Sequence, residues 1–157
     1  MAWTNPRTWV AGEKPSAATL NTHIRDNLKA IGDAWTAYTP TLTNWTLGNG
    51  TIVGAYSQAG KTVHWRVKYT AGSTSTYVGN ATFSLPATVT GSPFAFPVGR
   101  ATLADISAGT RATRTALSTD GTTFLLRDEA GVTVNATIPW TWATGDIIEV
   151  CGTYEAT

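Results

Sequence analysis

Side chains that could bind a metal ion are few and far apart in this sequence. The two histidines are His23 and His64, and neither belongs to an HExxH motif, a His-x-His pair or a Cys/His pair with ligand spacing. His64 alternates with Arg66 and Lys68, whose positive charges would repel a cation. We therefore expect a solvated strand position at His64, a polar helix position at His23, and no metal ion or cofactor.

Cys151 is the single cysteine, so the chain has no intrachain disulfide framework. It belongs to the apolar run that contains Ile147, Ile148 and Val150. This context predicts a buried strand thiol without a catalytic role, because an uncharged cysteine packs like a small hydrophobic residue.

The ten carboxylates are spread along the chain and group only at expected turns. The closest groups are Asp128 with Glu129, and Asp146 with Glu149, and acidic residues at turns commonly bond to local backbone. The sequence also lacks a GxSxG elbow, a GxxxxGK[ST] loop and a GxGxxG turn. We expect no enzyme. A carbohydrate-active enzyme stays an alternative of a different class, because two carboxylates could still converge about 5 to 9.5 Å apart across a cleft.

Aromatic residues are the side chains best suited to bind a ligand, because they stack on sugar rings or bases. The candidates are Tyr77, Trp140 and Trp142, and the last two lie two residues apart and hence on one face of an extended segment. Packing on the inner face of a sheet or at a subunit interface is the competing interpretation, and it applies to Trp65 on its strand.

An amphipathic helix is predicted from Ser16 to about Ile31. Its apolar residues recur at steps of four, four, three and four, so they share one helical face. Pro15 and Ser16 suit the start of a helix, and Gly32 suits its end. This face could associate with other copies of the chain or pack on the chain's own sheet. The predicted apolar face consists of Leu20, Ile24, Leu28, Ile31 and Trp35.

The residues before the helix are expected to form an extended arm, because Pro6 and Gly12 interrupt any regular period. An arm this short cannot build its own core, so its apolar groups must pack on the chain's own domain, on another subunit or on another protein. The predicted docking residues of the arm are Trp3, Arg7, Trp9 and Val10.

The remaining sequence predicts a mainly β domain. One segment alternates clearly, with Val63, Trp65, Val67 and Tyr69 on one face and polar residues between them. Eight or nine short strands at this spacing are typical of a β-sandwich or jelly roll. The predicted organisation is an arm and helix in residues 1–36 followed by a sandwich domain in 37–157. We expect the strands of this domain near residues 41–47, 51–57, 61–69, 81–85, 98–103, 111–117, 123–127, 132–137 and 147–154.

Length and charge limit the function further. A chain of 157 residues suits one domain with a short appendage. Charged residues make up only 13% and the net charge is +1, so binding of nucleic acid is not expected. A surface with so few charges also favours burial of part of it in an oligomer. No signal peptide or apolar stretch of membrane-spanning length is present, so we expect no membrane partner.

Several segments resemble small virion proteins from tailed phages of actinobacteria. The N-terminal similarity covers Trp3, the run from Pro6 to Glu13 and the run from Ala17 to Leu28. The β-domain similarity covers the runs Ala37 to Thr41, Gly48 to Thr51, Gly60 to Val63, Trp142 to Asp146 and Gly152 to Glu155, whereas Thr88 to Gly121 matches no pattern of the group.

The resemblance implies a homotrimeric structural protein of the virion without enzymatic activity, of a kind described as minor tail protein, tail fibre or head decoration. Its expected partners are other capsid or tail proteins, and its expected place is the virion, which is assembled in the cytoplasm of the bacterial host. Capsid decoration or a head fibre suits the short chain. The alternative is a tail-tip or tail-fibre protein that binds glycans on the host surface.

Overall fold

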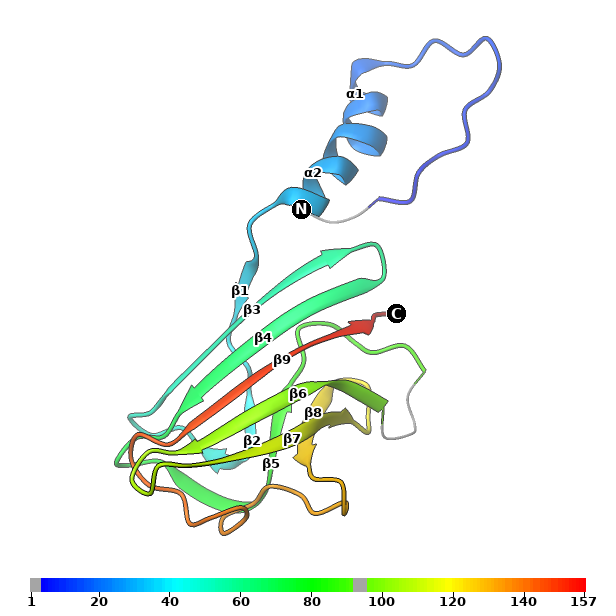
Figure 1. The fold of residues 1–157 in the computed structure, drawn as a ribbon. Coiled ribbons are helices and arrows are strands. Elements are labelled where there is room, and N and C mark those ends of the chain that lie inside the picture. The colour runs from blue at the N-terminus through cyan, green and yellow to red at the C-terminus, as the bar shows by residue number, and fades with distance from the viewer. Residues whose placement is uncertain (1–3, 92–95) are drawn as a thin grey trace.

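The computed structural model describes residues 4–91 and 96–157. Within these residues the chain is mainly β: nine strands form one antiparallel sheet, preceded by a short helix and an N-terminal segment (Figure 1). The predicted combination of a β-rich domain with an arm and one amphipathic helix is confirmed. The first strand begins at Thr36, beside the predicted boundary between residues 1–36 and 37–157.

The sheet combines strands that pair with their neighbours in sequence and one strand, β9, that pairs between two strands from earlier in the chain. Strands β3 and β4 are hairpin neighbours, β6, β7 and β8 follow one another, and β9 returns from the end of the chain to lie between β4 and β6. The spatial order of the strands is β1-β3-β4-β9-β6-β7-β8-β5-β2. In chain order the strands are β1 Thr36–Tyr38, β2 Leu42–Thr46, β3 Thr51–Ala59, β4 Thr62–Thr70, β5 Thr76–Ser84, β6 Phe96–Asp105, β7 Thr110–Ser118, β8 Thr123–Arg127 and β9 Ile147–Glu155.

This one sheet curls until its two parts face each other. Strand β8 pairs over only three residues with β7 and over three with β5, so it forms the corner of the sheet. Beyond this corner, β5 and β2 lie behind the broad front formed by β4, β9 and β6 (Figure 1). The two inner faces of the sandwich-like domain therefore belong to a single continuous sheet.

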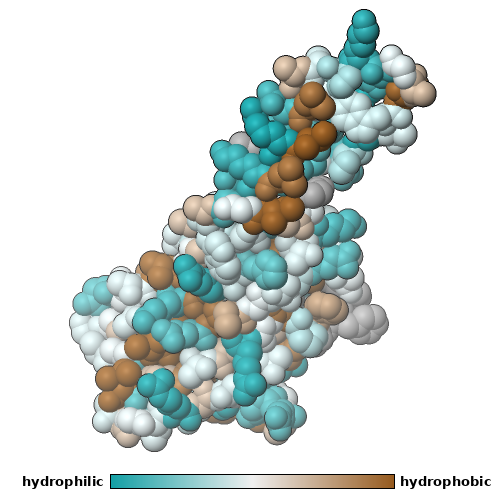
Figure 2. Space-filling model, turned by 45° about the horizontal axis from the view of Figure 1, so that its top comes forward, coloured by the Kyte–Doolittle hydropathy of each residue, from teal (hydrophilic) through white to brown (hydrophobic). Residues whose placement is uncertain are grey.

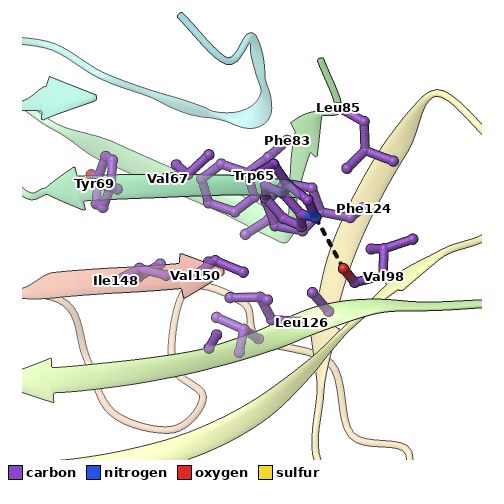
Figure 3. Packing of buried hydrophobic residues seen from close by; sticks show 14 of the residues in the cluster. Trp65, Val67, Tyr69, Phe83, Leu85, Val98, Phe124, Leu126, Ile148 and Val150 are labelled. Atoms are coloured by element: carbon purple, nitrogen blue, oxygen red, sulfur yellow. Dashed lines mark hydrogen bonds between the residues drawn. The ribbon is translucent and has the colours of Figure 1, made fainter. Parts of the chain in front are cut away.

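The core lies between these inner faces. On β4 the predicted alternation is confirmed, because Val63, Trp65, Val67 and Tyr69 are buried and the residues between them are exposed. The ring of Trp65 packs against Phe124 of β8 with centroids 4.8 Å apart, and its indole N–H donates to the Val98 carbonyl at 3.0 Å (Figure 3). Burial of such large side chains supplies most of the stability of the domain.

Two glycines allow β6 and β9 to approach each other. A Cβ atom at Gly152 would overlap the Val98 carbonyl oxygen, and one at Gly99 would lie 2.5 Å from the Cys151 carbonyl oxygen. Regular pairing of the two strands starts at the adjacent residues, Arg100 with Cys151. Glycine is therefore required here for close packing of two backbones.

The long connection from β8 to β9 is fixed by a buried carboxylate. Asp146 is fully buried, and its Oδ1 accepts the backbone N–H of Ile106 at 3.0 Å while its Oδ2 accepts that of Ala143 at 2.9 Å. The Asp146 side chain thus joins the β6–β7 turn to the segment that leads into β9.

Several sequence predictions are wrong in detail. β1 was not expected, and β5 begins at Thr76, ahead of the strand expected near 81–85. Cys151 is exposed, because the inward residues of β9 are Ile148 and Val150 and the next residue must point outward. Residues 132–137 form no strand and make one isolated bridge, between Thr133 and Arg127. Trp35 does not lie on the helix, which ends at Gly32, but in the link to β1.

The helix has the predicted limits. It comprises α1 (Ala17–Leu20), a π-helical turn η1 (Asn21–Arg25) and α2 (Asp26–Gly32), which follow one another without a break. Ser16 caps the first turn, because its hydroxyl accepts the Thr19 N–H at 3.1 Å. The helix stands beyond the end of the sheet, and α2 contacts β3 (Figure 1).

Candidate functional site

The apolar face predicted for the helix is exposed. Leu20, Ile24, Leu28 and Ile31, together with Trp35 in the link, form an apolar stripe whose members are 39 to 65% exposed. Figure 2 shows the leucine and isoleucine members of the stripe as a brown band along the helix. Single exposed apolar residues are common, but four in one line on a projecting helix, continued by Trp35 in the link, indicate a surface suited to packing against another polypeptide.

The spacing of the stripe fits the shape of the helix. Leu20 and Ile31 are eleven residues apart, and steps of four, four and three place three turns between them, or about 3.7 residues per turn. The π-helical turn from Asn21 to Arg25 contains more residues than an α-helical turn, which agrees with this value. The stripe therefore stays on one side of the helix over its whole length.

A neighbouring face of the helix is covered by the arm. Asn27 is buried, and its amide oxygen accepts the backbone N–H of Thr4 at 3.0 Å while its amide nitrogen donates to the Thr4 carbonyl at 2.7 Å. The same nitrogen lies 3.2 Å from the His23 carbonyl oxygen. Ala30, one turn further along, is also buried. The arm thus folds back along the helix and leaves the apolar stripe uncovered.

The predicted docking residues of the arm form a small polar and aromatic cluster. Arg7 makes an ion pair with Glu13 at 2.7 Å, and its guanidinium lies 5.0 Å from the centre of the Trp9 ring. Trp9 and Val10 are exposed. Trp3 lies outside the described residues. The side chains of Trp9 and Val10 are therefore available for contact with a partner, as the stripe is.

The stripe meets the β-domain at Trp35. The Arg66 guanidinium of β4 lies 5.0 Å from the centre of the Trp35 ring, a cation–π contact that holds the link against the outer face of the sheet. Beside it, a groove of about 710 Å³ lined by Ala30, Tyr56 and Lys61, among others, separates the base of the helix from β3. The helix is thus attached to the domain over a small area.

The three aromatic residues proposed for ligand binding lie together at one end of the core. Trp142 is buried, its indole N–H donates to the Asn135 carbonyl at 2.9 Å, and its ring lies 5.7 Å from Trp140 and 6.1 Å from Tyr77. Tyr77 packs on Trp45 with ring centres 4.7 Å apart, and burial raises the pKa of its hydroxyl. Trp140 and Tyr77 are half-buried, so part of each side chain reaches the surface.

The carboxylates of the β-domain bond mainly to nearby backbone. Asp120 accepts the N–H groups of Thr122 and Thr123, and Asp128 accepts that of Val132. His64 is hydrogen-bonded to the Thr153 hydroxyl at 2.8 Å on the outer face of the sheet. In residues 4–91 and 96–157, no three His, Cys, Asp or Glu side chains converge as metal ligands would. Among the described helices, none is long and apolar enough to cross a membrane.

The sequence predicts the residues of the stripe but gives no indication of Asn27, which fastens the arm to the helix, or of the contact between Arg66 and Trp35. Asn27 gave no signal because a polar residue beside an apolar helical face is expected to be solvated. The alternation along β4 correctly predicts Arg66 on the polar face, but its contact with Trp35 depends on the path of the link. Comparison with protein-family models, curated proteins and solved structures gave no match.

Proposed function

We propose that this chain is a structural protein of a bacteriophage virion, of the capsid-decoration or head-fibre type. The observation that carries the proposal is the exposed apolar stripe on a helix that projects from a well-packed β-domain. The resemblance of both ends of the chain to small virion proteins of actinobacterial phages supports the same function.

In this proposal the helix and arm fasten the chain, and the β-domain projects outward. The stripes of three copies pack together into a homotrimer, because a single-file apolar face on a helix is the surface that helical bundles bury. The β-domain fits an outward role because its own core is complete without the helix.

A second contact is needed in addition to the stripe. The stripe is buried between the copies of the trimer, so attachment to the virion needs a further surface, and stable interfaces bury about 800 Å² on each partner. The exposed Trp9 and Val10 of the arm supply the additional apolar surface. We assign this surface to contact with another capsid or tail protein of the virion.

The proposal contains no catalytic step and no cofactor. The buried carboxylate of Asp146 is occupied by two backbone N–H groups, and Asp120 by the turn that follows it. These interactions give the carboxylates a structural role in the loops to which they belong.

The direct test is the number of copies in purified virions of the phage that encodes the chain. Quantitative mass spectrometry is expected to give a copy number in proportion to the major capsid protein, and Leu28→Asp protein is expected to be lost from the particle. Absence of the chain from virions would refute the proposal, whereas a copy number proportional to the tail-tip proteins would move it to the tail.

A tail-tip or tail-fibre protein that binds glycans on the host surface is the second candidate. The observation that favours it is the aromatic cluster in which the half-buried Tyr77 and Trp140 both pack on Trp142. Binding of fluorescently labelled protein to intact host cells tests this candidate. Saturable binding that Trp140→Ala abolishes would support it, and no binding at micromolar concentration would exclude it.

A further inference from the structure

Three arginines lie in one row across the outer face of the sheet. The strand register pairs Arg66 with Cys151, Cys151 with Arg100, Arg100 with Thr115 and Thr115 with Arg127. Residues that are paired directly point to the same face of a sheet. The row therefore alternates long cationic side chains with small ones over strands β4, β9, β6, β7 and β8.

The alternation hollows the surface between the arginines. A groove of about 680 Å³ lies between Arg66 and Arg100, and small side chains, among them Ala55, Cys151 and Thr102, line it. A second groove of about 220 Å³ is lined by both Arg100 and Arg127. The two grooves share Arg100, so they form one interrupted channel along the row.

The row carries positive charge that the protein itself does not neutralise. Lys68, which also lines the larger groove, is paired with Glu149 at 3.0 Å. Arg66 makes its cation–π contact with Trp35, and the guanidinium of Arg100 has no hydrogen bond or ion pair within residues 4–91 and 96–157. The two grooves together contain five cationic and three acidic side chains, an excess of two in a protein of net charge +1.

The spacing of the arginines indicates which anion fits. Neighbouring arginines in the row are two strands apart, or about 10 Å. Carboxylates on one face of an extended peptide recur about every 7 Å, and each strand of duplex DNA carries a charge about every 3.4 Å. A linear polysaccharide with one acidic group in each disaccharide matches the longer spacing, and its narrow chain suits a shallow groove.

We propose that the outer face of β4, β9 and β6 binds an acidic polysaccharide, with Arg66 and Arg100 each paired to a carboxylate of the chain and Cys151 on the floor between them. Arginine is suited to this role because its planar guanidinium makes bidentate hydrogen bonds with carboxylates. This face touches the apolar stripe at Trp35, which Arg66 contacts, and binding there does not depend on the chain's place in a virion.

The test uses hyaluronan oligosaccharides, which carry one carboxylate per disaccharide, and isothermal titration calorimetry of the full chain at low ionic strength. Arg66→Gln and Arg100→Gln are each expected to weaken binding about tenfold. Arg111→Gln is the matched control, because Arg111 is an exposed arginine of β7 outside both grooves, and it should leave the affinity unchanged.

The single cysteine gives a second readout. Cys151 is exposed on the floor of the larger groove, so bound oligosaccharide should slow its alkylation in the wild-type chain and in Arg111→Gln, and Arg100→Gln should need about ten times more oligosaccharide for the same protection. The proposal would be overturned by the absence of saturable binding, by equal affinity in all variants, by alkylation that the oligosaccharide leaves unchanged, or by tighter binding of oligothymidylate or polyglutamate.

Discussion

At Asn27 one side chain connects the arm to the helix. Its amide bonds to both backbone groups of Thr4, and its burial removes these bonds from competition with water. Since no other described polar side chain of the helix makes a comparable bond to the arm, the course of the arm depends strongly on this residue.

Asn27→Ala is expected to release the arm without unfolding the β-domain. Loss of both amide hydrogen bonds should speed hydrogen exchange at the Thr4 amide about tenfold, as a loss of about 1.4 kcal/mol implies. Exchange measured by NMR or mass spectrometry checks this, with Thr22→Ala as a control on an exposed helix position. Unchanged exchange at Thr4 would show that the arm is held by other contacts.

Asp146 has a corresponding role in the β-domain. Asp146→Ala would leave the N–H groups of Ile106 and Ala143 without their acceptor, so we expect a loss of about 2 to 4 kcal/mol in the free energy of unfolding. Urea denaturation measures this loss. Glu129→Ala, in the same connection between β8 and β9, should change the stability by less than about 0.5 kcal/mol. Similar stability of both variants would contradict the assignment.

Asp105 makes the stability of the fold depend on pH in the acidic range. The N–H of Ala108 and the hydroxyl of Ser107 donate to its carboxylate at 2.9 and 2.7 Å, and they hold its pKa below the ordinary value of 3.8. A depressed pKa in the folded state stabilises the protein above the unfolded pKa, and this contribution is lost as the pH falls through the folded pKa. The melting temperatures of wild type and Asp105→Asn should therefore converge on acidification below 3.8. A constant difference would contradict this.

At the scale of elements, the contact between β6 and β9 depends on glycine. Gly152→Ala should destabilise the fold by about 1 to 3 kcal/mol, because the new methyl group would overlap the Val98 carbonyl and push the strands apart. Gly32→Ala is the control, since a Cβ there meets no atom within 4 Å and the residue ends a helix. Chemical denaturation of both variants checks the difference, and equal effects would refute it.

The sequence predicted elements well where a local period exists. The helix limits followed from Ser16 and Gly32, and β4 followed from strict alternation around Trp65. No strand forms in 132–137 because ladder pairing there is limited to the bridge between Thr133 and Arg127, and an apolar residue buried in a loop, such as Val134, resembles part of a short strand. Cys151 was misplaced because an apolar run hides the two-residue period that directs it outward.

At the scale of the whole molecule, long-range pairing placed features that no local pattern reveals. Arg66, Arg100 and Arg127 are distant in sequence, and they form a row because β9 enters the sheet between β4 and β6. The sequence alone also does not decide whether the apolar stripe is exposed or packs on the chain's own sheet. In the folded chain the stripe remains exposed, and the main contact of α2 with the domain is with β3.

The central claim is that the apolar stripe joins copies of this chain, and sedimentation equilibrium at micromolar concentration tests it most directly. Wild type and Thr22→Asp should sediment with three times the 16.6 kDa mass, and Leu28→Asp with the mass of one chain. Leu28 is 65% exposed, so its substitution leaves the fold of the single chain intact. A monomeric wild type, or a Leu28→Asp variant that remains trimeric, would contradict the claim.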